Sequence, residues 1–164
     1  MTALCARVAT DADAEAMQEI YRAASLSNEG DRAELLARPE LLILDPELAS
    51  SGRAVVATAD SVGPVAFASH RPISDDVSEL DDLFTHPAWC RKGAARLLMA
   101  AIVDDALTRD IRRIEVTANV HAMAFYEAVG FQHIGTADTE LRPAPRMALA
   151  FGAERGTGAA LTRR

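Results

Sequence analysis

The stretch WCRKGAARLL, residues 89–98, places one glycine among three basic side chains, Arg91, Lys92 and Arg96. A β-like run, ELDDLF, precedes it, and an apolar-periodic helical pattern follows it. A glycine at the first turn of a helix lets backbone N–H groups point toward one spot, which the helix dipole makes positive. The stretch therefore predicts either an anion-binding turn or a solvated basic helix start, and these residues alone leave both open.

The composition is that of an ordinary globular protein. The chain has 164 residues, of which 49% are hydrophobic and 25% charged, enough for one domain with its own core. The formal net charge of -7 disfavours nonspecific attraction to nucleic acid or to an anionic membrane. We therefore expect neither nucleic acid nor membrane as a partner.

Cysteine usage and the N-terminal residues indicate a cytoplasmic protein. Cys5 and Cys90 are the only cysteines, too few for a disulfide framework. The first residues contain no apolar segment of the kind found in signal peptides, and the longest strongly apolar run, Leu97–Val103, is too short to span a bilayer. We expect a cytoplasmic location.

The hydrophobic pattern predicts strands and helices in the order β-α-α-β-β-β-α-β-α-β-β. The expected strands are 4–9, 53–59, 64–70, 78–85, 112–119, 131–136 and 146–151. The expected helices are one that begins at Thr10 or Asp11 and others near 32–37, 94–108 and 121–129. This order predicts an α+β (mixed α/β) fold with one sheet. We expect a single domain over residues 1–151 and a C-terminal tail without regular structure over residues 152–164.

A second motif, NVHAMAFYEAVGF, occupies residues 119–131. It runs from the end of a strand through a short helix to the next strand, and Gly130 stands where a helix C′ glycine is expected. Ala122 and Phe125 could be simple core residues. Tyr126 brings a hydroxyl that needs a hydrogen-bond partner or a function if it is buried.

Together, the turn and helix of residues 87–98 and the motif of residues 119–131 resemble the GCN5-related N-acetyltransferase (GNAT) superfamily. The resemblance extends from about Ser78 to Phe131. It implies a mostly antiparallel central sheet, splayed between strands 4 and 5, with helices on both faces. It also implies that acetyl-CoA is the cosubstrate and that no metal is needed.

The resemblance assigns the cosubstrate-binding residues as well. Backbone groups of Leu83, Phe84 and Thr85 would pair with the pantetheine arm, in the manner of strand addition to a sheet edge. Asn119 and Tyr126 match family positions that contact the cosubstrate, the tyrosine near its sulfur. The turn that would hold the diphosphate comprises Arg91, Lys92, Gly93, Ala94, Ala95 and Arg96.

Cys90 departs from the family pattern, which usually has Gln or Arg at this first position of the turn. Since backbone amides later in the turn make most of the diphosphate contacts, we expect at worst a weaker affinity for acetyl-CoA. Thr85, in place of the more common valine, is a milder change.

The family reaction is a direct transfer in which an amine attacks the thioester and CoA thiolate leaves. Keeping an alkylammonium neutral at pH 7 costs about 4–5 kcal/mol, so a base must take its proton. Glu79 matches the family position for this base, and Asp81 shares its face by the period of two, while Asp82 points to the opposite face. We expect Glu79 or Asp81 as base, with Asp82 as an alternative, and Tyr126 as the acid that serves the departing sulfur.

The acceptor is expected to be a small-molecule or protein amine, and a homodimer is one expected assembly. Asn28, Glu29 and Asp31 are available to meet a cationic amine, and Asp138 and Glu140 could face them. These regions diverge too much within the family to identify the substrate.

Other interpretations remain open. The chain could be a catalytically silent acyl-CoA-binding sensor or partner module. Cys90, beside basic residues and near His86, could be a nucleophile, although no third orienting group is evident. A metal site is not expected, because the cysteines and histidines lack the spacing of paired ligands.

Overall fold

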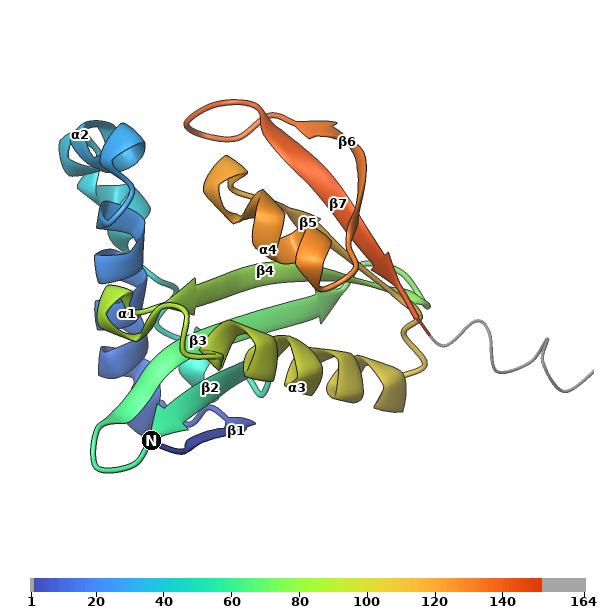
Figure 1. Cartoon of the computed structure of the whole chain (residues 1–164), viewed down its shortest axis with the longest axis horizontal. Coiled ribbons are helices and arrows are strands. Elements are labelled where there is room, and N and C mark those ends of the chain that lie inside the picture. Colours follow the sequence, from blue (N-terminus) through green and yellow to red (C-terminus); the bar gives the residue numbers. More distant parts are fainter. Residues whose placement is uncertain (1, 152–164) are drawn as a thin grey trace, which may run out of the picture. The chain divides into compact units, whose positions relative to one another are not determined.

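A computed structural model describes residues 2–151 of the chain, and Figure 1 shows its elements. The strands are β1 Leu4–Val8, β2 Ala54–Ala59, β3 Gly63–Pro72, β4 Val77–Thr85, β5 Arg113–Thr117, β6 Gln132–Ala137 and β7 Ala144–Ala150. The helices are α1 Ala14–Leu26, α2 Glu29–Ala37, α3 Ala94–Thr108 and α4 Met123–Ala128. Short 3₁₀ turns are η1 Asp11–Asp13, η2 Pro39–Leu42, η3 Leu48–Ser50, η4 Pro87–Trp89 and η5 Val120–Ala122.

The seven strands form one sheet in the order β1-β2-β3-β4-β5-β7-β6. The pairs β1–β2, β2–β3, β5–β7 and β6–β7 are antiparallel, whereas β4 and β5 are parallel. The parallel ladder joins only Val77–Glu79 to Arg113–Glu115, although β4 has nine residues. The expected fold class, a mostly antiparallel sheet splayed between strands 4 and 5, is confirmed.

The described residues divide into two compact units, and both β4 and α3 contribute to each. The first unit contains the residues up to His70 together with Asp81–Val103. The second contains Arg71–Leu80 and the residues from Asp104 onward. The expectation of a single domain over residues 1–151 stays a prediction, and the expected tail, 152–164, lies outside the described residues.

The core of the first unit lies between α1 and the strands beside it. Its buried members are Ala9 and residues of α1, η3, β2 and β3, and Tyr21 and Phe84 pack against them. Val56 and Ala57 are adjacent in β2 and point to opposite faces, yet both are fully buried. Both faces of this part of the sheet are therefore covered.

At the helix start predicted for Thr10 or Asp11, the structure has the 3₁₀ turn η1 from Asp11, which leads into α1 at Ala14. The Thr10 N–H donates to Asp13 Oδ2 at 2.8 Å, as in a capping box. Arg7, from β1, donates to both Asp13 oxygens, at 2.7 and 2.9 Å. This pairing lowers the pKa of Asp13 and ties the first strand to the start of the helix.

In the second unit, Gly130 is the helix C′ glycine that the sequence predicts, and α4 ends there in a Schellman motif. The Gly130 N–H donates to Glu127 O at 3.1 Å, and the Phe131 N–H donates to Tyr126 O at 2.9 Å. Gly130 has a φ of +107°, a conformation that other residues adopt only with strain. Among residues 2–151, no helix is both long and apolar enough to cross a membrane.

Candidate active site

The basic turn before α3 forms a backbone concavity. Arg91 and Gly93 have positive φ values of 61° and 91°. The first intrahelical bond of α3 runs from Leu97 N to Gly93 O at 3.0 Å, so the N–H groups of Ala94 and Ala95 have no acceptor one turn earlier. Alternating conformations of this kind at a helix start form an anion-binding arrangement of backbone N–H groups.

The side chains of the turn leave its centre open. Arg91, Lys92 and Arg96 are exposed, and Lys92 Nζ lies 4.7 Å from the centroid of the Trp89 ring. A Cβ built on Gly93 would meet no atom within 4 Å. The space beside Gly93 is therefore not filled by protein atoms.

Cys90 is exposed, and its thiol points to a backbone carbonyl. Its Sγ lies 3.8 Å from His86 O, while the His86 ring nitrogen Nδ1 accepts from the Ala88 N–H at 3.2 Å. The ring that would have to activate the thiol is thus engaged with its own backbone. This geometry offers no support for the alternative of a cysteine nucleophile.

The end of β4, expected to pair with pantetheine, is anchored by aromatic packing. The Phe84 ring contacts Tyr21 edge to face with centroids 4.9 Å apart, and Phe67 with centroids 5.6 Å apart. The Tyr21 hydroxyl in turn donates to Leu41 O at 2.8 Å. These contacts hold the backbone of Leu83, Phe84 and Thr85 in place from one side.

The first acid of β4, Glu79, is held by an arginine from the far end of the chain. Arg146 Nη1 and Nη2 donate to the two Glu79 oxygens at 2.5 and 3.0 Å. Arg146 also donates to Glu115 at 2.6 Å and to the Thr117 hydroxyl at 3.0 Å. The hydrogen bond to Glu79 is the main reason why the pKa of Arg146 is raised. Glu79 is thus one member of a charged network that joins β4, β5 and β7.

The other two acids of β4 lie in the first unit and differ from one another. Asp81 Oδ2 lies 3.7 Å from Arg53 Nη1, within ion-pair distance. Asp82 is partly buried and accepts a very short hydrogen bond from the Ser69 hydroxyl. Burial is the main cause that raises the pKa of Asp82, and the Ser69 hydrogen bond lowers it.

Tyr126 is buried at the core of the second unit. Its side chain is 5% exposed and packs edge to face on Phe125 and Phe131, with centroids 5.5 and 5.1 Å apart. Within residues 2–151 its hydroxyl has no hydrogen-bond partner. Burial raises the pKa of Tyr126 above that of an ordinary tyrosine, so the phenol is protonated at neutral pH.

Asn119 has a local role, and the predicted acceptor residues lie at the start of α2. Asn119 Oδ1 accepts from the His121 N–H at 2.9 Å and so caps the turn η5. Asn28 precedes α2, Glu29 is exposed, and Asp31 is 6% exposed. Of the acids expected near the acceptor, Glu29 is thus open to solvent, whereas Asp31 is enclosed in the fold.

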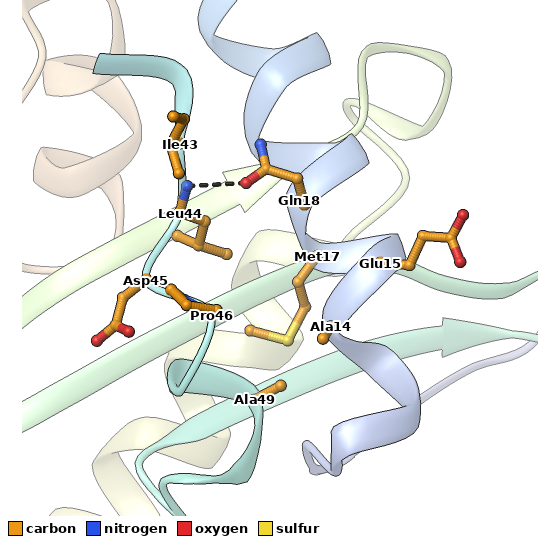
Figure 2. Close-up of a pocket in the computed structure, with 9 residues that line it drawn as sticks. All are labelled: Ala14, Glu15, Met17, Gln18, Ile43, Leu44, Asp45, Pro46 and Ala49. Atoms are coloured by element: carbon orange, nitrogen blue, oxygen red, sulfur yellow. Dashed lines mark hydrogen bonds between the residues drawn. The ribbon is translucent and has the colours of Figure 1, made fainter. Parts of the chain in front are cut away.

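A cavity of about 320 Å³ lies between α1 and residues 43–49 (Figure 2). Its lining is mainly apolar, and Glu15 and Asp45 are its two acidic residues. Gln18 crosses between the two segments: its Oε1 accepts from the Leu44 N–H and its Nε2 donates to Leu42 O, both at 2.8 Å. None of the residues predicted for the active site lines this cavity.

The partners of the β4 acids are not evident from the sequence. Ser69 reads as one polar residue in an apolar strand, and Arg146 as a residue near the chain's end. Only the sheet register brings them to Asp82 and Glu79. Among the described residues, no three His, Cys, Asp or Glu side chains gather in a way that could hold a metal ion.

Comparison with known proteins decides the family. The model of the acetyltransferase (GNAT) family matches residues 14–131, which include both sequence motifs. This chain belongs to the GNAT family. A sequence search found no match among curated proteins.

Solved structures of the GNAT type share the fold at low sequence identity. One is PaiA N-acetyltransferase from Thermoplasma acidophilum in complex with coenzyme A, with 18% identity and a TM-score of 0.70 over 91% of this chain and 99% of that one. Another is YncA from Salmonella typhimurium with its cofactor acetyl-CoA, with 19% identity and a TM-score of 0.66 over 93% and 96%. Ard1 from Thermoplasma volcanium has 16% identity and a TM-score of 0.68 over 92% and 99%.

Proposed function

We propose that this GNAT protein is an N-acetyltransferase that moves the acetyl group of acetyl-CoA directly to a primary amine in a ternary complex. The observation that carries the proposal is the match to the acetyltransferase family across residues 14–131. Two of the solved structures with this fold contain coenzyme A or acetyl-CoA. Acetyl-CoA accordingly fits as the cosubstrate.

The turn before α3 suits the diphosphate of the cosubstrate. Its open space at Gly93 and the helix-start N–H groups of Ala94, Ala95 and Arg96 favour an anion, and Arg91 and Lys92 add positive charge nearby. Backbone groups of Leu83–Thr85 would hold the pantetheine arm, and the Asn119 side chain would add a polar contact. Cys90 is expected to weaken this binding at worst, because backbone amides later in the turn would make most of the diphosphate contacts.

In the proposed reaction, acetyl-CoA supplies an activated acetyl thioester. The neutral amine attacks the carbonyl carbon, forming a C–N bond, and the C–S bond then breaks. A backbone N–H at Phe84 or Thr85 stabilises the negative charge on the carbonyl oxygen. Tyr126, whose buried hydroxyl has no partner among the described residues, donates a hydrogen bond to the departing sulfur. A carboxylate of β4 receives the proton of the incoming ammonium, and from the sequence this carboxylate is expected to be Glu79 or Asp81.

The acceptor is proposed to be a small-molecule or protein amine that meets Asn28, Glu29 or Asp31. We also keep as predictions that the enzyme is cytoplasmic and that it forms a homodimer. Nothing in the composition favours nucleic acid or a membrane as partner.

Two measurements on the full chain test the proposal. Acetyl-CoA is expected to raise the melting temperature, since a ligand that binds only the native state stabilises it. A panel of alkylamines, amino acids, polyamines, aminoglycosides and a lysine peptide is then tested for release of free thiol from acetyl-CoA. Stabilisation without thiol release from any amine would favour the silent acyl-CoA-binding module, and no stabilisation at all would contradict acetyl-CoA binding.

A further inference from the structure

The three acids of β4 differ in what neutralises them. Glu79 is bound by both terminal nitrogens of Arg146, and Asp81 faces Arg53. For Asp82, the only hydrogen bond among the described residues comes from a neutral donor, the Ser69 hydroxyl, and no cation lies within ion-pair distance. A carboxylate paired with arginine is a weaker base than one held by a neutral donor, because the cation favours its ionised form. Asp82 is thus the acid of β4 that no arginine pairs with.

Polar and charged groups from several elements surround Asp82. Ser69 of β3 is fully buried and holds one carboxylate oxygen. Asp81 and Asp45 oppose the negative charge of Asp82, and Arg53 favours it. Burial raises the pKa of the Tyr21 phenol of α1, and the negative charge of Asp82 adds to this rise. Burial is the largest cause; together with Asp81 and Asp45 it exceeds the opposing effects of the Ser69 hydrogen bond and Arg53, so the pKa of Asp82 is raised, toward the range that suits a general base.

Asp82 also lies beside the strand segment expected to meet the thioester. Phe84, whose backbone N–H is a candidate for the oxyanion contact, follows two residues later on the same strand. Two residues of extended chain span about 7 Å. An amine that attacks a thioester held at Phe84 would therefore be within reach of the Asp82 carboxylate, directly or through one water. Phe84 packs on Tyr21, and the negative charge of Asp82 acts on the Tyr21 phenol. Asp82, Tyr21 and Phe84 therefore lie in one region of the first unit.

We propose that the Asp82 carboxylate, held by Ser69, is the base that accepts the proton of the acceptor amine, in place of Glu79 or Asp81. This inference rests on the proposed function. The ammonium gives one proton to Asp82 and becomes a neutral amine, which forms the C–N bond. The second proton lost by nitrogen goes to the CoA sulfur as the C–S bond breaks, and Asp82 releases its proton to solvent. Ser69 is a positioning residue, because it acts only through Asp82.

The test compares wild-type enzyme with Asp82→Asn, Ser69→Ala and Glu79→Gln, using the most active amine of the panel over a range of pH. Asp60→Asn, in the exposed turn between β2 and β3, is the matched control for loss of one acidic charge. Asp82→Asn is expected to lower kcat/KM by about 10²–10⁴-fold while acetyl-CoA still raises the melting temperature. With an amine that is already neutral at the assay pH, such as a trifluorinated ethylamine, the loss should largely disappear, since no proton need be removed.

Ser69→Ala provides an independent readout. The rate should rise with pH as Asp82 ionises, and since the Ser69 hydrogen bond lowers the pKa of Asp82, its removal should move this limb to higher pH. A merely structural role for Ser69 would lower the rate without moving the limb, and would count against the proposal. If Asp82→Asn does not fold, the pH profile of Ser69→Ala still tests whether Asp82 is the base.

The outcomes distinguish a failure of the role of Asp82 from a failure of the proposed function. Wild-type activity with an undiminished Asp82→Asn rate, or a pH limb that Glu79→Gln abolishes and Asp82→Asn retains, would overturn the role of Asp82 and leave the proposed function standing. If no amine causes wild-type enzyme to release thiol, the proposed function fails and the role of Asp82 with it.

Discussion

Replacing Tyr126 with phenylalanine removes one hydroxyl from a side chain that is 5% exposed. That hydroxyl has no hydrogen-bond partner within residues 2–151, so its loss leaves no protein group unsatisfied. We expect the free energy of unfolding to change by less than about 0.5 kcal/mol, or to rise slightly. The aromatic packing on Phe125 and Phe131 is retained, because the ring is unchanged.

The effect on transfer should be much larger. An ordinary thiol has a pKa near 8.5 and an ordinary tyrosine one near 10, so full proton transfer to the thiolate is uphill by about 2 kcal/mol. Burial, which raises the pKa of Tyr126, widens that gap. Tyr126 therefore acts chiefly by hydrogen bonding to the developing thiolate, and its loss is expected to lower kcat by about 10²-fold, near the lower end of acid–base effects.

Single-turnover acetyl transfer, acetyl-CoA affinity and thermal melting would be measured together. Tyr21→Phe serves as the contrast in stability, since its hydroxyl donates to Leu41 O at 2.8 Å. That variant should lose about 0.5–1.5 kcal/mol, whereas Tyr126→Phe should lose almost nothing. A Tyr126→Phe enzyme that transfers acetyl at the wild-type rate would refute the assigned role, and one that melts far below wild type would show that the hydroxyl has a structural partner.

Two further predictions concern stability. Asp13→Asn should cost about 1 kcal/mol at pH 7, because it keeps the cap to Thr10 but removes the charge paired with half-exposed Arg7. Since the pKa of Asp13 is lowered in the fold, this difference is complete above the unfolded-state pKa near 4 and vanishes as pH falls through the folded-state pKa; urea unfolding at pH 7 and below pH 3 would reveal a pH-independent difference if the charge were irrelevant. Gly130→Ala should cost about 1–2 kcal/mol, because φ is +107° and the new Cβ would lie 3.2 Å from Leu149 Cδ1. Gly30→Ala, inside α2 with open space around it, should instead be neutral or stabilising in the same thermal melts, and equal effects of the two substitutions would contradict the backbone argument.

The elements around the two motifs were predictable because their signals are local. The apolar periodicity of residues 94–108 gives α3 its observed bounds, and Gly130 ends α4 through a glycine-specific conformation. Strand β5 alternates with period two, and the structure buries Ile114 and Val116 as expected. A periodic pattern or a cap is encoded within a few residues, so one sequence is sufficient to detect it.

Residues 38–51 were harder to interpret. They form two 3₁₀ turns and an extended stretch that carries Asp45, and they enclose the cavity beside α1. Two prolines and the lack of periodicity indicate an irregular path but not its direction. What fixes that path is Gln18, which binds backbone groups of Leu42 and Leu44 from 24 and 26 residues away.

The choice among the acids of β4 is a question of the same kind. Period-two alternation groups Glu79 with Asp81 and separates them from Asp82, but it gives no measure of how readily each can bind a proton. That property depends on Arg146, Arg53 and Ser69, which lie 67, 28 and 13 residues from their partners. Basicity is set by these nonlocal contacts and by burial. Glu79, which matches the family position, can therefore be engaged in an ion pair while Asp82, on the same strand, remains able to accept a proton. The comparison of Glu79→Gln with Asp82→Asn tests this reasoning directly, because both substitutions remove one carboxylate from the same strand and only the second removes one without a paired arginine.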